Sequence, residues 1–97
     1  MVGALWGDSA QGQAGCSVAA CRYLNAVGSG FEPGGTVSAS CWGDHGGEWY
    51  QFSSTYELAV APDGSVELAG MCYFGFEGSH AKVVIDGVES NVLTSGE

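Results

Sequence analysis

Basic residues are almost absent from this sequence of 97 residues. It has two lysine and arginine residues against eleven aspartate and glutamate residues, a formal net charge of −9 at pH 7. Binding to a nucleic-acid backbone depends on basic side chains that displace the counterions of the phosphates. The acidic residues are scattered singly among apolar positions, which is typical of a solvated surface. The composition therefore argues against nucleic acid as a partner.

Long hydrophobic runs are also missing. No apolar segment approaches the ~20 residues that a membrane-spanning helix needs, and no signal peptide is visible. We therefore predict no direct insertion into a membrane. Seventeen glycines interrupt the sequence and leave little room for helices. Short strands are the elements that this composition permits.

The cysteines lack the spacing of a metal or redox site. There is no Cys-x-x-Cys pair, and no histidine stands at ligand spacing from a cysteine. Four cysteines in a short chain fit two disulfides formed in an oxidising compartment, although the sequence allows three pairings. The spacing favours a short loop closed by Cys16 and Cys21. This leaves Cys41, at a strand end, to meet Cys72.

The length supports one domain, residues 1–97. A chain this short buries only about 60–65% of its unfolded surface, so its disulfides contribute a large share of its stability. We expect the mature part of a secreted or cell-surface protein, located extracellularly or at the cell surface.

Alternation of apolar and polar side chains predicts strands along most of the chain. The pattern is clearest in four segments, residues 36–41, 55–60, 65–68 and 81–86. Three further strands are predicted at residues 2–6, 21–27 and 88–94, the first of them at a sheet edge. Residues 17–23 are the one helix candidate, which we assign instead to a loop that enters a strand.

Turn residues separate these segments at intervals of about ten residues, the spacing of a β-sandwich. Pro62-Asp63-Gly64 and Asp86-Gly87 are the clearest turns, and each is predicted to join adjacent antiparallel strands. Phe31 is predicted to anchor another turn, residues 31–35, in the core. The fold class is therefore all-β, an antiparallel immunoglobulin-like sandwich of about seven strands with two disulfides.

Several motifs carry a resemblance to a known family. They are Gly7-x-Ser9-Ala10-Gln11-Gly12-Gln13-x-Gly15-Cys16-Ser17, Cys21-Arg22-Tyr23-Leu24, Phe31-x-Pro33-Gly34, Cys72-Tyr73-x-Gly75 and Asp86-Gly87-x-x-Ser90-Asn91. In these motifs the chain resembles an immunoglobulin-like module near the C-terminus of secreted and membrane-anchored actinobacterial proteins. It is more distantly similar to the neocarzinostatin-like apoproteins of the enediyne antibiotics. The resemblance implies the sandwich fold and the extracellular location, and it implies no enzymatic activity. Where the family pattern has two tryptophans, this chain has Lys82 and Ser95.

The strongest candidate for a site is the segment from residue 42 to residue 52, which is rich in glycine, aromatic and polar residues. We predict a loop here, with the residues after Cys72 carried beside it. Flat aromatic rings suit sugar faces or protein hot spots. The alternative is that half of these rings fill the core. The predicted binding residues are Trp42, Trp49, Tyr50, Tyr73 and Phe76.

Catalytic chemistry is poorly supported. Asp44, His45 and Glu48 could form an acid–base set, but no Gly-x-Ser-x-Gly nucleophile motif is present. His45 and His80 could bind a metal only if the fold brought them together. We therefore predict no catalytic residue, no metal and no cofactor.

The sequence thus predicts a non-catalytic extracellular binding or spacer module with its ligand surface on aromatic, glycine-rich loops. The expected partner is a protein or a carbohydrate at the cell surface. One alternative is a self-associating structural subunit of a surface assembly that pairs through residues 2–6. Another is a small-molecule-binding or hydrolytic domain, which would need a pocket that holds Asp44, His45 or Glu48.

Overall fold

The fold of the chain is an all-β sandwich. The computed structural model describes residues 1–14, 16, 21–75 and 79–95, which contain nine strands and no helix that could cross a membrane. The strands are β1 (Val2–Ser9), β2 (Arg22–Gly28), β3 (Thr36–His45), β4 (Glu48–Gln51), β5 (Tyr56–Ala59), β6 (Val66–Phe74), β7 (His80–Ile85), β8 (Val88–Glu89) and β9 (Leu93–Thr94). The predicted all-β antiparallel sandwich is confirmed.

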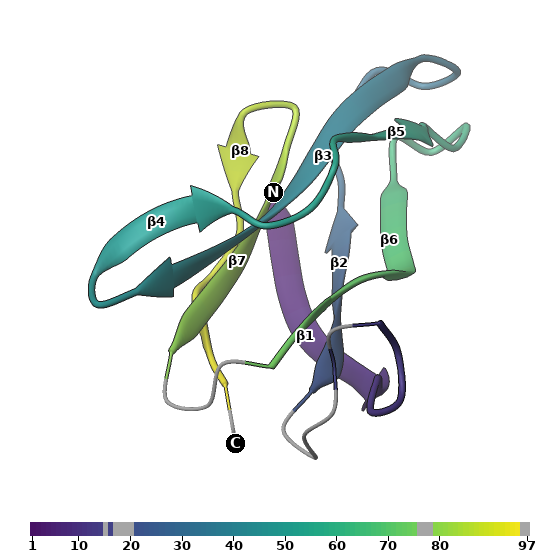
Figure 1. The fold of residues 1–97 in the computed structure, drawn as a ribbon. Coiled ribbons are helices and arrows are strands. Elements are labelled where there is room, and N and C mark those ends of the chain that lie inside the picture. Colours follow the sequence, from purple (N-terminus) through teal and green to yellow (C-terminus); the bar gives the residue numbers. More distant parts are fainter. Residues whose placement is uncertain (15, 17–20, 76–78, 96–97) are drawn as a thin grey trace.

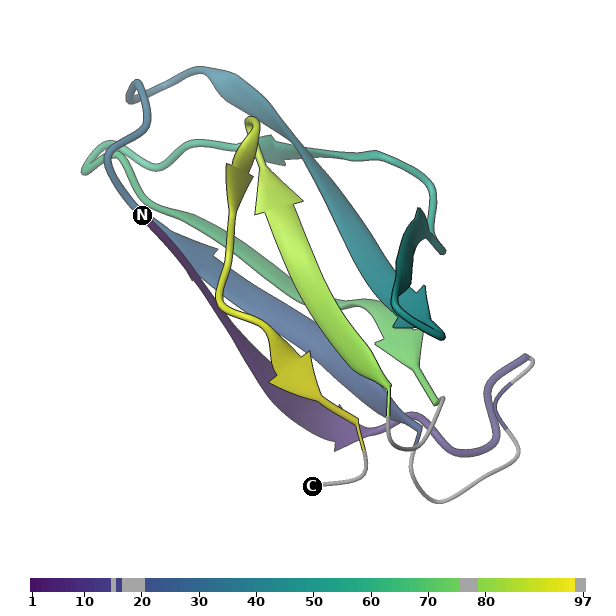
Figure 2. The same cartoon turned by 90° about the vertical axis from the view of Figure 1, so that its left-hand side faces the viewer.

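Two antiparallel sheets form the layers of the sandwich (Figures 1 and 2). One sheet has three strands in the order β1-β2-β6. The other has six, in the order β4-β3-β7-β8, with β5 also paired to β3 and β9 to β7. The first predicted strand is an edge strand, as expected, but it continues to Ser9.

The core lies between the sheets because apolar residues recur at alternate positions along the longer strands, such as β2 and β7. In β7, Ala81, Val83 and Ile85 are fully buried, whereas Lys82 and Val84 between them are only partly covered. The alternation that predicts this strand therefore also identifies its buried face.

Both predicted disulfides are present. Cys41 of β3 is bonded to Cys72 of β6 with 6.7 Å between the Cα atoms, so this bridge crosses the core and joins the two sheets. Cys16 is bonded to Cys21 with 5.9 Å between the Cα atoms, after the loop that follows β1. A backbone hydrogen bond from Ala10 to the Cys21 carbonyl holds that loop against β2.

Two tight turns join paired strands. Asp86 and Gly87 (φ 50° and 77°) connect β7 to β8, which confirms the predicted hairpin. Gly46 and Gly47 (φ 68° and 92°) connect β3 to β4 in the same way. Type I′ hairpin turns need this left-handed conformation at both residues. The prediction of a loop over residues 42–52 is therefore wrong, because most of the segment is a hairpin.

The turn at Pro62-Asp63-Gly64 joins the two sheets and is not a hairpin, which corrects the prediction. β5 belongs to the six-stranded sheet and β6 to the three-stranded one. The Asp63 carboxylate accepts hydrogen bonds from the hydroxyl and backbone N–H of Ser65, and these bonds lower the pKa of Asp63. The Gly64 carbonyl accepts a hydrogen bond from Phe31, which packs partly buried against the core as predicted.

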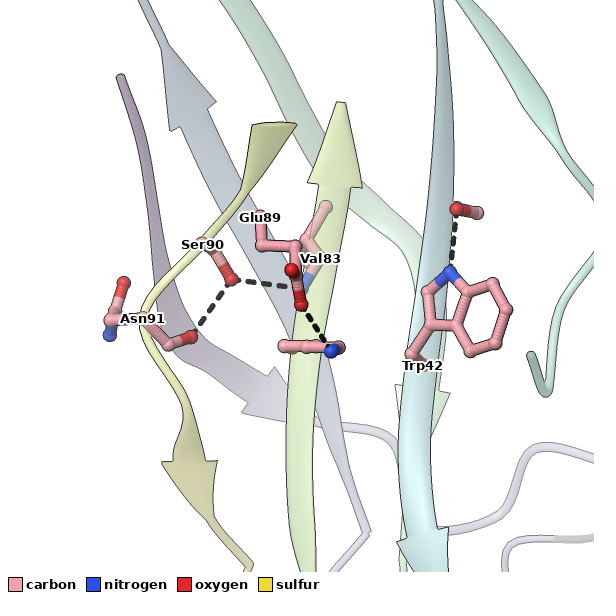
Figure 3. Close-up of polar contacts among 7 residues, drawn as sticks. Trp42, Val83, Glu89, Ser90 and Asn91 are labelled. Atoms are coloured by element: carbon pink, nitrogen blue, oxygen red, sulfur yellow. Dashed lines mark hydrogen bonds and ion pairs between the residues drawn. The ribbon is translucent and has the colours of Figure 1, made fainter. Parts of the chain in front are cut away.

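The predicted last strand, residues 88–94, is divided into β8 and β9. Ser90 interrupts it, since its hydroxyl accepts the Val83 N–H and donates to the Asn91 carbonyl (Figure 3). Asn91 then reaches across to the other sheet. Its Oδ1 accepts the Ala4 N–H at 2.7 Å and its Nδ2 donates to the Ala4 carbonyl at 3.2 Å. One side chain thus pairs with β1 as a neighbouring strand would.

Gly43 in β3 is required by a close approach of an aromatic ring. A Cβ added there would lie 2.3 Å from the ring of Phe74. We expect Gly43→Ala to lower the free energy of unfolding by about 1–3 kcal/mol, because the buried ring must move. Gly3→Ala in β1 is the control, since nothing lies within 4 Å of its added Cβ. Urea unfolding of both variants tests this expectation, and equal losses would contradict it.

The contact between Asn91 and Ala4 gives a second expectation. Asn91→Ala leaves the N–H and the C=O of Ala4 without their hydrogen-bond partner. It should lower the free energy of unfolding by about 1–3 kcal/mol. Val92→Ala, at the next residue and 52% exposed, should cost much less. Thermal and urea unfolding give the stability difference, and faster exchange of the Ala4 amide hydrogen would locate the effect. Unchanged exchange at Ala4 would argue against this role for Asn91.

Candidate functional site

The outer surface of the six-stranded sheet presents two tryptophans. Cys41 points into the core, so the alternation of β3 directs Trp42 and Asp44 to the outside. Cross-strand pairing places Lys82 opposite Trp42, and Trp49 opposite Asp44, on the same surface. This surface is named the tryptophan face. It comprises Trp42, Asp44, Trp49, His80, Lys82 and Glu89.

Lys82 lies at the centre of the tryptophan face. Its Nζ is 4.3 Å from the ring centroid of Trp49 and forms an ion pair with Oε1 of Glu89. The Lys82 side chain is 16% exposed, while that of Glu89 is 62% exposed. An ammonium group over an indole is attracted by the negative face of the ring, by about 0.5–2 kcal/mol. The face therefore already binds one cation with a ring and a carboxylate.

Trp42 is held in place by its own strand. Its Nε1–H donates to the Ser40 hydroxyl at 2.8 Å, a contact seen in Figure 3 beside β3. The indole is half-buried and does not belong to the core cluster. Trp49 is 37% exposed. Both rings therefore offer surface to solvent from fixed backbone positions.

Asp44 is bonded twice to His80. Its Oδ1 accepts the backbone N–H of His80 at 2.6 Å, and its Oδ2 lies 3.0 Å from the ring Nδ1. The backbone hydrogen bond, followed by the side-chain one, lowers the pKa of Asp44 below its ordinary value. Sequence reasoning grouped Asp44 with His45 and Glu48 because they are close in the chain. The pairing of β3 with β7 brings in His80 instead.

The pair of Asp44 and His80 lacks the other parts of a hydrolytic site. A carboxylate that orients a histidine needs a nucleophile at the second ring nitrogen. Within the described ranges, His80 has no hydrogen bond to a hydroxyl or thiol. The same residues contain no group of three or more His, Cys, Asp or Glu side chains that could hold a metal ion. The hydrogen bonds between Asp44 and His80 join β3 to β7.

Tyr50 belongs to an aromatic row that leads into the core. It pairs with the inward-facing Gly43, and its ring meets Phe52 with 6.5 Å between centroids. Phe52 in turn packs on the buried Phe74 at 5.1 Å, and Phe74 stacks on Trp6 at 6.4 Å. Phe52 therefore packs partly buried against the core, and the half-buried Tyr50 contacts it from the hairpin.

Tyr73 faces away from the tryptophan face. Cys41 and Cys72 both point inward, so the residues that follow them, Trp42 and Tyr73, leave opposite sheets in opposite directions. The Tyr73 ring meets Tyr23 edge-on at 5.9 Å. Trp42 and Tyr73 therefore lie on opposite outer surfaces of the sandwich, with the disulfide between them. Phe76, another predicted binding residue, lies outside the described residues.

A hollow of about 410 Å³ lies between β6 and the connection from β4 to β5. It is lined by Ala14, Phe52, Ser53, Tyr56, Met71, Cys72 and Tyr73. The Tyr56 hydroxyl donates a hydrogen bond to the Met71 carbonyl. The Tyr73 hydroxyl donates one to the Ala14 carbonyl. Among the described residues, those that line this hollow include no carboxylate and no histidine.

Comparison with protein-family models, curated proteins and solved structures found no match for this chain. The fold and its bridges define the class of protein, a disulfide-bonded β-sandwich. The function proposed below is therefore argued from the residues of the tryptophan face.

The hydrogen bonds of Asp44 predict a pH dependence. Because its pKa is lowered on folding, the ionised carboxylate stabilises the fold above its ordinary pKa of 3.8, and this stability is lost as the pH falls through the lower folded value. The difference in melting temperature between the native chain and Asp44→Asn should therefore be greatest above the ordinary pKa of 3.8 and should shrink as the pH falls below it. Asp8→Asn, an exposed carboxylate of β1, is the control. An equal effect there would assign the result to overall charge.

Proposed function

We propose that the chain is a non-catalytic binding module of an exported protein and that its ligand binds on the tryptophan face. The observation that carries this proposal is the pair of indoles, Trp42 and Trp49, on the outer surface of the six-stranded sheet. Neither ring belongs to the core cluster, so burial between the sheets does not account for them.

The surroundings of the two rings suit recognition. Indoles bury a large area at low entropic cost and dominate many interfaces. Asp44 and Glu89 add acceptors beside the rings, and both sit on strands, which hold side chains more firmly than loops do. The ligand classes that fit are a protein surface or a carbohydrate. Two disulfides are compatible with an extracellular location, and the resemblance to secreted modules supports the same location.

Self-association through the edge strand β1 has less support. A strand that recruits a second copy needs free N–H and C=O groups along its outer side. At Ala4, in the middle of the predicted pairing segment, both groups are bonded to Asn91. The tryptophan face is therefore the better candidate for contact with a partner.

Trp42→Ala tests the proposal. We expect the affinity for a ligand of this face to fall by about 1–3 kcal/mol. Because the ring is half-buried, stability should fall by less than the ~3–5 kcal/mol typical of a core aromatic. Arrays of glycans and of extracellular protein domains are probed with the native chain, with Trp42→Ala and with the control Leu5→Ala, an exposed residue of the other sheet. The proposal fails if every ligand found binds Trp42→Ala as well as the native chain.

A further inference from the structure

Charge narrows the chemistry of the partner, an inference that rests on the binding face proposed above. The chain has eleven acidic and two basic residues, and both basic side chains are engaged within the molecule. Arg22 Nε donates to the Gly7 carbonyl, and Lys82 is paired with Glu89. The surface that a partner approaches is therefore negative. Such a potential speeds the encounter with cationic partners and disfavours anionic ones.

Across the sheet, carboxylates lie on both sides of Trp42. Glu57 of β5 pairs with Ser38 of β3, two positions before Ser40 and on the same outer surface. Glu89 of β8 pairs with Val84 of β7. The order β5, β3, β7, β8 puts these residues three strand spacings apart across the sheet, or about 14 Å in that direction. A single small cation cannot span that distance, whereas an extended polypeptide covers it with about four residues.

Lys82 shows how a cation is held on this face. Its ammonium group is placed over Trp49 and neutralised by Glu89. The second ring, Trp42, has no cation over it in the described part of the chain. An incoming lysine or arginine side chain can therefore use Trp42 as Lys82 uses Trp49, because both rings attract a cation in the same way.

We propose that the tryptophan face binds a basic polypeptide segment, with one lysine or arginine stacked on Trp42 and others paired with Glu57 and Glu89. In this arrangement Lys82 competes with the partner, because it occupies Glu89 and the ring of Trp49. Removing its charge frees both groups. The native lysine therefore sets the affinity below the maximum that the face can reach.

The probe is a peptide of twelve residues with arginine at every fourth position among glycine and serine. Its binding is measured by tryptophan fluorescence and calorimetry at about 20 mM and 200 mM salt. The native chain should bind it, more weakly at the higher salt, and should not bind the same peptide with glutamate in place of arginine. Absence of binding to the arginine peptide at low salt would overturn the inference.

Variants of the face separate specific binding from general attraction. Trp42→Leu keeps apolar bulk without the ring and should weaken binding about 5- to 30-fold. Glu57→Gln should weaken it about 2- to 5-fold. Glu67→Gln, an exposed carboxylate of the three-stranded sheet, is the matched control and should change it less than about 2-fold. An equal loss in Glu67→Gln would mean that net charge alone attracts the peptide, and it would refute the assignment to this face.

Lys82→Met gives the sharpest test, because misfolding cannot produce the expected result. It keeps the apolar stem of the side chain and should tighten binding of the arginine peptide about 3- to 10-fold. Weaker or unchanged binding would contradict the competition. A neutral oligosaccharide that binds the native chain but not Trp42→Leu, with no binding of the basic peptide, would overturn this inference and leave the proposed function standing. If Trp42→Leu changed the binding of no ligand, both this inference and the proposed function would be refuted.

Discussion

The bond between Cys41 and Cys72 sets which side of each sheet every neighbouring residue occupies. It fixes one inward position on β3 and one on β6, and alternation then assigns the positions before and after them. Trp42 is directed outward for this reason, and Gly43 inward against Phe74. The location of the tryptophan face follows from a covalent bond on the opposite side of the same strand.

Regularities within a strand could be predicted from the sequence, and contacts between distant strands could not. The buried face of β7 follows from its alternation, and the short loop from Cys16 to Cys21 follows from its spacing. The bonds from Asp44 to His80 join residues 36 positions apart, and no local pattern specifies that pairing. The hairpin of β3 and β4 did leave a signal, since Gly46-Gly47 is a favoured pair in type I′ turns. The surrounding glycine and aromatic residues obscured it, because they resemble a binding loop.

Lys82 is the one lysine of a strongly acidic chain, and its contacts lie on the tryptophan face. The Lys82 side chain is largely buried, and its ammonium group interacts with both the Trp49 ring and the Glu89 carboxylate. Its position couples β7 to β4 on one side and to β8 on the other. Under the proposed function, these contacts of Lys82 would affect both the stability of the sheet and the affinity of its outer surface for a partner.

Two of the contacts that join the sheets differ in kind, because one is a covalent bond and the other is a pair of hydrogen bonds. The bridge from Cys41 to Cys72 cannot open without reduction, whereas Asn91 holds Ala4 by two hydrogen bonds that break and re-form. Local fluctuations should therefore pivot about the covalent side and separate β1 from the segment between β8 and β9. The sheets therefore stay joined at Cys41 under oxidising conditions, while the link at Ala4 can open without any covalent bond breaking.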